Sequence, residues 1–112
     1  MYEYNVTIIR IIDGDTIEVL ADLGFSVHAQ VIIRLDRINA PELDDVRGWM
    51  SRAYVNKMIA DCHQVRIRSR KQEKYGRWLA EVLLQMKSTD TALLNLNDDL
   101  VQHGHAVYTD YS

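Results

Sequence analysis

Acidic and basic side chains recur in three short segments of this 112-residue chain. In chain order the segments are Asp13-Gly14-Asp15-Thr16, residues 34 to 42, and Lys74-Tyr75-Gly76-Arg77. Carboxylates can hold a hard cation or activate water, and arginine forks can clamp a phosphate. These residue types supply the positioning and charge stabilisation on which metal-assisted phosphodiester hydrolysis depends.

Each segment also has a purely structural explanation when taken alone. An Asp-Gly pair is a common hairpin turn, although a turn does not require the second carboxylate at Asp15. Asn39 and Pro41 could shape a turn that leaves Glu42 solvated. The arginines could be ordinary surface charges. Trp78, which follows the third segment, could be a core residue, the interpretation we favour, or a platform on which bases stack.

Composition indicates a soluble globular chain folded as a single domain over residues 1–112, with 47% hydrophobic and 26% charged residues. No apolar run has the length of a membrane helix. The first residues show no basic region followed by an apolar stretch, so we expect no signal peptide and a cytoplasmic location. The lone Cys62 cannot form an internal disulfide and is expected to be a passive thiol in a helix.

The charge is unevenly distributed along the chain. A formal net charge of −3 argues against a protein that coats nucleic acid non-specifically. Residues 61 to 80, in contrast, are rich in basic side chains: Arg66, Arg68, Arg70, Lys71, Lys74 and Arg77. A locally basic face on an acidic protein suits an enzyme that binds a polyanion and releases it.

Hydrophobic patterning predicts an α+β chain dominated by short strands. Strands are expected over residues 5–12, 17–22, 27–35, 65–68 and 78–86, with loops at 39–48 and 71–76. A helix is expected over residues 49–62, and a short one over 98–103 capped by Asn97, followed by an irregular tail. This order is that of a five-stranded OB-type barrel with one central helix and a short C-terminal helix, although composition leaves other small α+β folds open.

The three segments resemble, in order, the motifs of the staphylococcal nuclease (thermonuclease) family. That family carries D-G-D-T, then R-L-x-x-[IV]-D-x-P-E, then K-Y-G-R-x-L-A. This chain has Asp13-Gly14-Asp15-Thr16, then Arg34-Leu35-Asp36-Arg37-Ile38-Asn39-Ala40-Pro41-Glu42, then Lys74-Tyr75-Gly76-Arg77-Trp78-Leu79-Ala80. A final family feature matches Leu100-Val101-Gln102-His103-Gly104-His105-Ala106, so the resemblance covers roughly residues 5 to 108.

The resemblance implies an OB-fold nuclease that cuts DNA and RNA with Ca²⁺ and leaves 3′-phosphate ends. Asp15 would be the first metal carboxylate, with further oxygens from Asn39 and the backbone carbonyl of Ala40. Glu42 would orient or deprotonate the attacking water. The phosphate clamps would be Arg34 and Arg77. Lys74 and Tyr75 would contact the neighbouring phosphate, and Tyr108 and Tyr111 of the tail are further candidate substrate-binding residues.

The main departure from the family pattern is Asn39, where the family has a second metal carboxylate. Its amide can still offer one oxygen, and we expect Ca²⁺ binding weaker by roughly one to two orders of magnitude. Asp36, Asp44 or Asp45 could compensate. We expect the further C-terminal helix of secreted family members to be missing, with either a core that is stable without it or a partner subunit that covers the gap.

Other functions are kept open by the sequence. The same fold could be a non-catalytic module that binds single-stranded nucleic acid, which Asn39 favours, or a protein-interaction domain. Single-stranded or frayed DNA or RNA would be the partner of both the nuclease and the binding module. The histidines His28, His63, His103 and His105 lack zinc-ligand spacing. No Ser–His or Cys–His arrangement indicates a nucleophilic enzyme.

Overall fold

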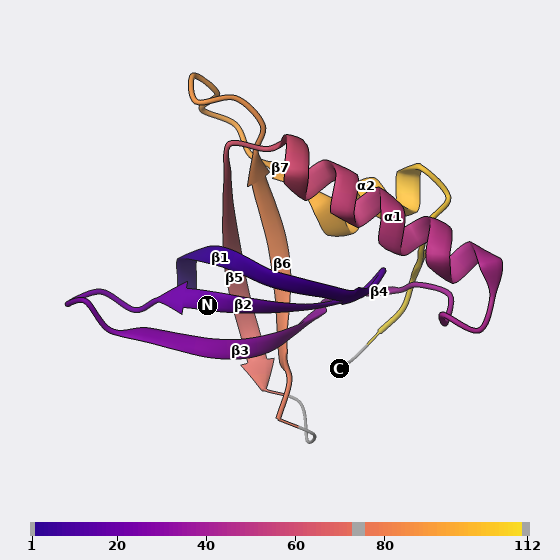
Figure 1. Ribbon diagram of the computed structural model, residues 1–112, viewed down its shortest axis with the longest axis horizontal. Helices are drawn as coiled ribbons and strands as arrows, with labels where there is room; N and C mark the ends of the chain where they lie inside the picture. The colour runs from indigo at the N-terminus through magenta and orange to yellow at the C-terminus, as the bar shows by residue number, and fades with distance from the viewer. Residues whose placement is uncertain (1, 73–75, 111–112) are drawn as a thin grey trace.

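The structure, a computed structural model, describes residues 2–72 and 76–110 (Figure 1). Its elements in chain order are β1 (Tyr2–Asp13), β2 (Thr16–Asp22), β3 (His28–Leu35), β4 (Ile38–Asn39), α1 (Val46–Asp61), β5 (Gln64–Gln72), β6 (Trp78–Gln85), β7 (Leu94–Asn95), α2 (Leu96–Gln102) and β8 (Val107–Tyr108). Helices α1 and α2 both lie on one side of the strands in Figure 1.

Strands β1, β2, β3, β5 and β6 close into a barrel. The sheet order is β3-β2-β1-β5-β6-β7, and β3 returns to pair with β6. That closing seam is parallel and runs from the pair Ile33–Trp78 to the pair Leu35–Ala80. Closure satisfies backbone groups that the edges of so small a sheet would otherwise expose. The predicted α+β class, a five-stranded OB-type barrel with a central helix and a short C-terminal helix, is confirmed.

Alternation along β2 shows how the strands fill the barrel. Ile17, Val19 and Ala21 are buried, whereas Glu18 and Leu20 between them are only half-buried. This period of two is what a strand with one face toward a core requires. Similar buried positions on β3, β5 and β6 complete the interior.

Strand β1 is long because it pairs with two neighbours. Its first half lies beside β5 and its second half beside β2. The register with β2 shifts between Ile8 and Arg10 and again between Ile11 and Asp13. Such bulges bend a strand and increase its twist, which lets one strand serve two walls of the barrel.

Helix α1 packs against β1 and buries the face formed by Gly48, Ser51 and Val55. The predicted start at Trp49 is wrong, because Asp45 caps the helix by accepting a hydrogen bond from the Arg47 amide at 2.9 Å. The loop predicted to end at Gly48 therefore stops earlier, and Gly48 lies inside the first turn.

Helix α2 packs against β6 and is capped by Asn95, whose side chain accepts a hydrogen bond from the Asp98 amide at 3.2 Å. The predicted cap, Asn97, is wrong. Asn97 is fully buried, accepts from the Val82 amide at 3.0 Å and donates to the Asp36 carbonyl at 2.8 Å. The helix consequently begins two residues before the predicted first residue.

The tail is not wholly irregular, which corrects another expectation. β8 pairs antiparallel with β4, so that Ile38 lies opposite Tyr108 and Asn39 opposite Val107. Strand β5 is also longer than predicted and extends into the expected loop as far as Gln72. Within the described ranges, no helix combines the length and apolar character needed to cross a membrane.

Candidate active site

Asp15 lies in the turn between β1 and β2 and is 6% exposed. Its carboxylate accepts hydrogen bonds from the Ala40 amide at 2.8 Å and from the Thr16 hydroxyl at 3.1 Å. Gly14 permits this packing, because a Cβ there would lie 2.7 Å from Cβ of Ser51 on α1. The carboxylate predicted to bind metal is therefore a fixed, buried group and more than a solvated turn residue.

Arg34 reaches from β3 into the same place and is equally buried. One terminal nitrogen, Nη2, lies 3.1 Å from Asp15 Oδ2 and donates to Asn39 Oδ1 at 3.0 Å. The other, Nη1, donates to the Leu35 and Ile38 carbonyls at 3.2 Å each. Contacts on both nitrogens fix the guanidinium, so its charge is preorganised.

Glu42 lies two residues after Ala40 and is exposed. Two residues of chain span at most about 7 Å between Cα atoms, so the Glu42 backbone lies within that distance of Ala40, whose amide binds Asp15. Gly48 allows the loop to lie close against α1, because a Cβ there would be 2.0 Å from the Glu42 carbonyl oxygen. Glu42 is therefore accessible to solvent water.

Arg77 is half-buried and directly precedes β6. The closing seam pairs Arg34 with Leu79, two residues further along. Since side chains alternate along an extended chain, we expect Arg77 on the same face of the barrel wall as Arg34. The candidate residues Lys74, Tyr75 and Tyr111 lie outside the described residues.

The electrostatics of Asp15 are those of a buried carboxylate beside a second one. Burial first, and the neighbouring Asp13 carboxyl second, raise the pKa of Asp15 to about 6, although the Ala40 amide and Arg34 oppose this shift. Asp13 is held in place by the Asp15 amide, which donates to Asp13 Oδ1 at 3.0 Å. The local charge of two carboxylates against one guanidinium favours an added cation.

The oxygen atoms near Asp15 suit a hard cation in kind but are few. Asp15 Oδ2 and Asn39 Oδ1 contact the same Arg34 nitrogen, so the two oxygens lie close together, and a cation would bind them beside the guanidinium. Ca²⁺ takes six to eight oxygens, so water or substrate would have to supply several. In residues 2–72 and 76–110, no three His, Cys, Asp or Glu side chains are grouped to hold a metal. These residues therefore fit a weakly held hard cation.

The aspartates that could compensate for Asn39 are mostly engaged elsewhere. Asp36 is 3% exposed and binds Arg70 through both oxygens, at 2.7 and 3.1 Å. Asp45 caps α1 and pairs with Arg47. Asp44 is exposed. Asp36 and Asp45 thus already neutralise arginines.

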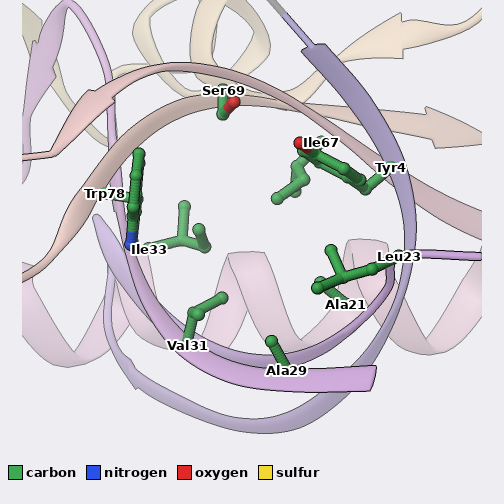
Figure 2. A pocket seen from close by; sticks show the side chains of 9 residues that line it. All are labelled: Tyr4, Ala21, Leu23, Ala29, Val31, Ile33, Ile67, Ser69 and Trp78. Atoms are coloured by element: carbon green, nitrogen blue, oxygen red, sulfur yellow. The ribbon is translucent and has the colours of Figure 1, made fainter. Parts of the chain in front are cut away.

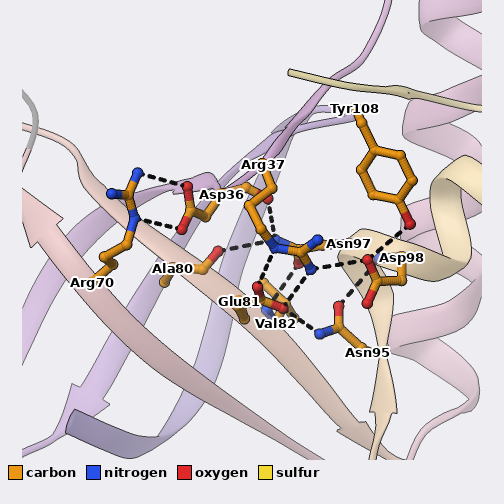
Figure 3. Close-up of polar contacts among 10 residues, drawn as sticks. All are labelled: Asp36, Arg37, Arg70, Ala80, Glu81, Val82, Asn95, Asn97, Asp98 and Tyr108. Carbon is orange, nitrogen blue, oxygen red and sulfur yellow. Dashed lines mark hydrogen bonds and ion pairs between the residues drawn. The ribbon is translucent and has the colours of Figure 1, made fainter. Parts of the chain in front are cut away.

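Tyr108 belongs to a polar network around Arg37 (Figure 3). Its hydroxyl donates to Asp98 at 3.0 Å, and its ring lies 5.8 Å from the guanidinium carbon of Arg37. The side chain is 55% exposed, so its ring remains accessible to a substrate. Its predicted substrate contact would involve the ring, because the hydroxyl is already bonded.

Arg37 is the centre of this network and was missed as a site-forming residue. It donates to both Glu81 oxygens, at 2.6 and 3.0 Å, and to Asp98 at 2.9 Å. Its carbonyl accepts from the Thr109 amide at 2.8 Å, and its φ is +69°. The network therefore fixes the turn between β3 and β4, and so the position of Asn39. No local sequence signal indicates these partners.

The basic stretch predicted from the sequence is partly neutralised. Arg66, Arg68 and Arg70 alternate along β5, and Arg68 pairs with Glu3 at 3.0 Å. Arg70 pairs with Asp36 as above, and Arg66 contacts the Asn5 side chain at 3.4 Å. The carboxylates of Glu3 and Asp36 thus reduce the positive potential that this stretch offers to a polyanion.

The staphylococcal nuclease homologue family model matches residues 32–112. This match covers more than half of the chain and includes Arg34, Asn39, Glu42 and Arg77. The chain therefore belongs to the staphylococcal nuclease homologue family.

Two curated relatives cover almost the whole chain. A micrococcal nuclease of Shigella flexneri is 34% identical over 110 residues, which are 93% of this chain and 58% of that protein. Protein ParB of Escherichia coli is 35% identical over 106 residues, 93% of this chain and 56% of that protein. The chain thus spans a little over half the length of these relatives.

Proposed function

We propose that the protein is a nuclease that hydrolyses phosphodiester bonds of DNA, RNA or both. The observation that carries the proposal is the buried Asp15–Arg34 pair, joined by Asn39 and followed two residues after Ala40 by the solvated Glu42. Family membership and the similarity to a micrococcal nuclease support it. Single-stranded or frayed ends are the substrates we expect, with little sequence preference, because phosphate contacts carry no base information.

The proposed roles follow from the positions of the charges. Glu42 takes the proton of a water molecule, and that water attacks the phosphorus. Arg34 and Arg77 offset the charge that develops on the phosphate oxygens. The bond between phosphorus and the 5′ oxygen breaks, and its electron pair stays on that oxygen, which takes a proton from solvent water. The products are a 3′-phosphate and a 5′-hydroxyl. Because Arg34 is already fixed by its contacts, little reorganisation is needed at the moment of reaction.

Calcium is the metal we propose, held by Asp15, Asn39 and the Ala40 carbonyl. When bound, it would add positive charge against the phosphate. The amide at Asn39 carries no charge, so we propose that Ca²⁺ binds weakly and that millimolar Ca²⁺ is enough to occupy the site.

A second candidate function is a non-catalytic module that binds single-stranded nucleic acid. The specific observation in its favour is that Arg34 already neutralises Asp15, while Asn39 contributes no charge. Such a module would bind oligonucleotides in a salt-dependent manner without cutting them.

Cleavage of a fluorescent single-stranded DNA in millimolar Ca²⁺ tests the proposal. Parallel reactions contain a chelator, the Glu42→Gln variant, or the Glu3→Gln variant as a matched control on an exposed glutamate of β1. Cleavage by the wild type and Glu3→Gln, lost with chelator and with Glu42→Gln, supports the metal nuclease. Binding without cleavage at high Ca²⁺ leaves the binding module.

The product ends give an independent check on the chemistry. When the probe carries its label on the 5′ end, phosphatase treatment should change the electrophoretic mobility of the labelled fragment only if its new end carries the predicted 3′-phosphate. A 5′-phosphate on the downstream fragment would contradict the proposed bond cleavage.

A further inference from the structure

A cavity of about 250 Å³ opens at one end of the barrel and is used by none of the roles proposed above (Figure 2). Its walls are mainly aliphatic, with Val31, Ile33 and Ile67 among them. Two aromatic side chains, Tyr4 and Trp78, complete the lining. Sites for drug-sized ligands usually exceed about 300 Å³, so this cavity suits a single small ring system.

Trp78 is the side chain of the cavity most suited to recognition. It is 37% exposed, although its partner in the seam, Ile33, is buried. Figure 2 shows the indole edge-on at the border of the cavity, with a ring face turned inward. Figure 2 places Tyr4 across the cavity from Trp78 and Ser69 between them, each with a hydroxyl oxygen, and the Ser69 hydroxyl donates to the Tyr2 carbonyl at 3.5 Å. The cavity therefore offers one stacking surface and two hydrogen-bonding groups in an apolar setting.

The cavity adjoins the two arginines through the barrel wall. Ile33 and Trp78 face the cavity, and each is a direct sequence neighbour of an arginine, Arg34 and Arg77 respectively. Because side chains alternate, those arginines are expected on the outer side of the wall. The seam between β3 and β6 starts at the Ile33–Trp78 pair, and residues 28–32 of β3 lie beyond it. The outer face and the cavity therefore meet at the end of the seam.

We propose that this cavity is a nucleobase subsite of the nucleic-acid substrate. The inference rests on the proposed function for the nature of the ligand. A nucleotide beside the scissile phosphate turns its base round the end of the seam and stacks it on Trp78. The polar edge of the base meets the hydroxyls of Tyr4 and Ser69, and the sugar–phosphate remains outside with Arg34 and Arg77.

The chemistry of the lining favours a base over other small ligands. A flat aromatic ring with polar edges uses both the indole face and the hydroxyls, whereas an aliphatic ligand would leave the hydroxyls unused. The neighbouring arginines also select a ligand that carries a phosphate. Stacking on an aromatic side chain tolerates every base, in agreement with the weak sequence preference proposed above.

Oligonucleotide binding in the presence of chelator tests the subsite without requiring cleavage. The probe is a labelled single-stranded octanucleotide, and anisotropy measures its affinity for four proteins. Trp78→Ala should weaken binding about 5- to 100-fold, as expected for the loss of one stacked base. Trp49→Ala, at the other and more exposed tryptophan, should change it less than about 2-fold.

Ala29→Leu is the fourth protein and guards against misfolding of Trp78→Ala. Ala29 is half-buried in the cavity wall, so a leucine there would fill the space while Trp78 stays in place. This variant should keep a wild-type urea midpoint or exceed it, and it should still bind the probe more weakly. Wild-type affinity in both Ala29→Leu and Trp78→Ala would overturn the proposal.

Abasic probes separate base stacking from a structural role of Trp78. One abasic nucleotide is placed at each position of the octanucleotide in turn. At one position the abasic probe should bind the wild type more weakly than the intact probe does, whereas Trp78→Ala should bind both probes equally. Equal losses in both proteins at every position would overturn the subsite.

The two proposals can fail independently in these experiments. If the wild type never cleaves but the coupling between Trp78 and one base persists, the nuclease fails and the subsite stands. Normal cleavage with no effect of Trp78→Ala on binding would remove the subsite alone.

Sedimentation gives a further outcome, because Phe25 is fully exposed on the β2–β3 hairpin. A dimer that Phe25→Ser dissociates, with no oligonucleotide binding, would assign the cavity to a second copy and overturn the proposal.

Discussion

Arg34 and Asp15 form a buried ion pair where β2 begins, with 3.1 Å between Nη2 and Oδ2 and both side chains 8% exposed. The guanidinium also binds Asn39, and the carboxylate also binds the Ala40 amide. Removing a buried ion pair from water costs free energy, so neighbouring groups must form hydrogen bonds with the polar atoms that the pair itself leaves unbonded. The same contacts therefore determine the stability of the fold here and the geometry of the proposed site.

Arg34→Gln is expected to lower the free energy of unfolding by about 3–5 kcal/mol, because Asp15 would remain buried without its charge partner. The double variant Asp15→Asn/Arg34→Gln should recover much of this loss, since no charge is then buried. Urea unfolding of the wild type, both single variants and the double variant measures the coupling. A double variant as unstable as Arg34→Gln would show that the ion pair is not the cause.

Asn39→Asp is expected to strengthen Ca²⁺ binding by about 10- to 100-fold, because it replaces a neutral amide oxygen of the proposed metal site with a charged carboxylate oxygen. Isothermal titration with Ca²⁺ measures the change. Asn5→Asp, at an exposed position on β1, is the matched control and should leave the affinity unaltered. An Asn39→Asp variant with wild-type affinity would remove residue 39 from the metal ligands.

The barrel could be predicted from the sequence because its strands carry the signal locally. The buried positions Ile17, Val19 and Ala21 alternate with less buried neighbours, as the pattern indicated. The helix boundaries could not be predicted as well. Asn95 and Asn97 are equally good caps by residue type, and only the contacts of Asn97 with other elements decide between them.

The candidate site was also predictable only in part. The motifs brought Asp15, Arg34 and Asn39 to attention, and the structure joins these three directly. The ion pairs of Arg37 that fix the β3–β4 turn were not predictable, because Glu81 and Asp98 are 44 and 61 residues away in the chain. Ion pairs over such separations leave no local pattern to read.

The positive φ of Arg37 is expected to separate the stabilities of two variants at this position. Both Arg37→Ala and Arg37→Gly lose the ion pairs with Glu81 and Asp98, but only glycine adopts a φ of +69° without strain. Arg37→Gly should therefore be more stable than Arg37→Ala by about 1 kcal/mol in urea unfolding. Equal stability of the two would mean that the turn relaxes when the side chain is removed.

Gly48 supports the proposed position of Glu42. Gly48→Ala would bring a Cβ to 2.0 Å from the Glu42 carbonyl oxygen, so α1 or the loop must move. We expect a loss of about 1–3 kcal/mol in unfolding free energy and lower cleavage activity. Met50→Ala, two residues along the helix at an exposed position, should stay within about 0.5 kcal/mol of wild type. Wild-type stability of Gly48→Ala would contradict the close approach.

Tyr54 on α1 should make stability fall at alkaline pH, because its hydroxyl donates to Asp99 on α2 at 2.5 Å. Burial first, and this hydrogen bond second, raise the pKa of Tyr54 to about 12. The folded state therefore holds the proton more tightly than the unfolded state, whose tyrosine pKa is about 10. This contribution to stability is complete below about pH 10 and is lost as the pH rises to about 12. Urea midpoints between about pH 9 and pH 12 should fall more steeply for the wild type than for Tyr54→Phe, and parallel curves would contradict the assignment.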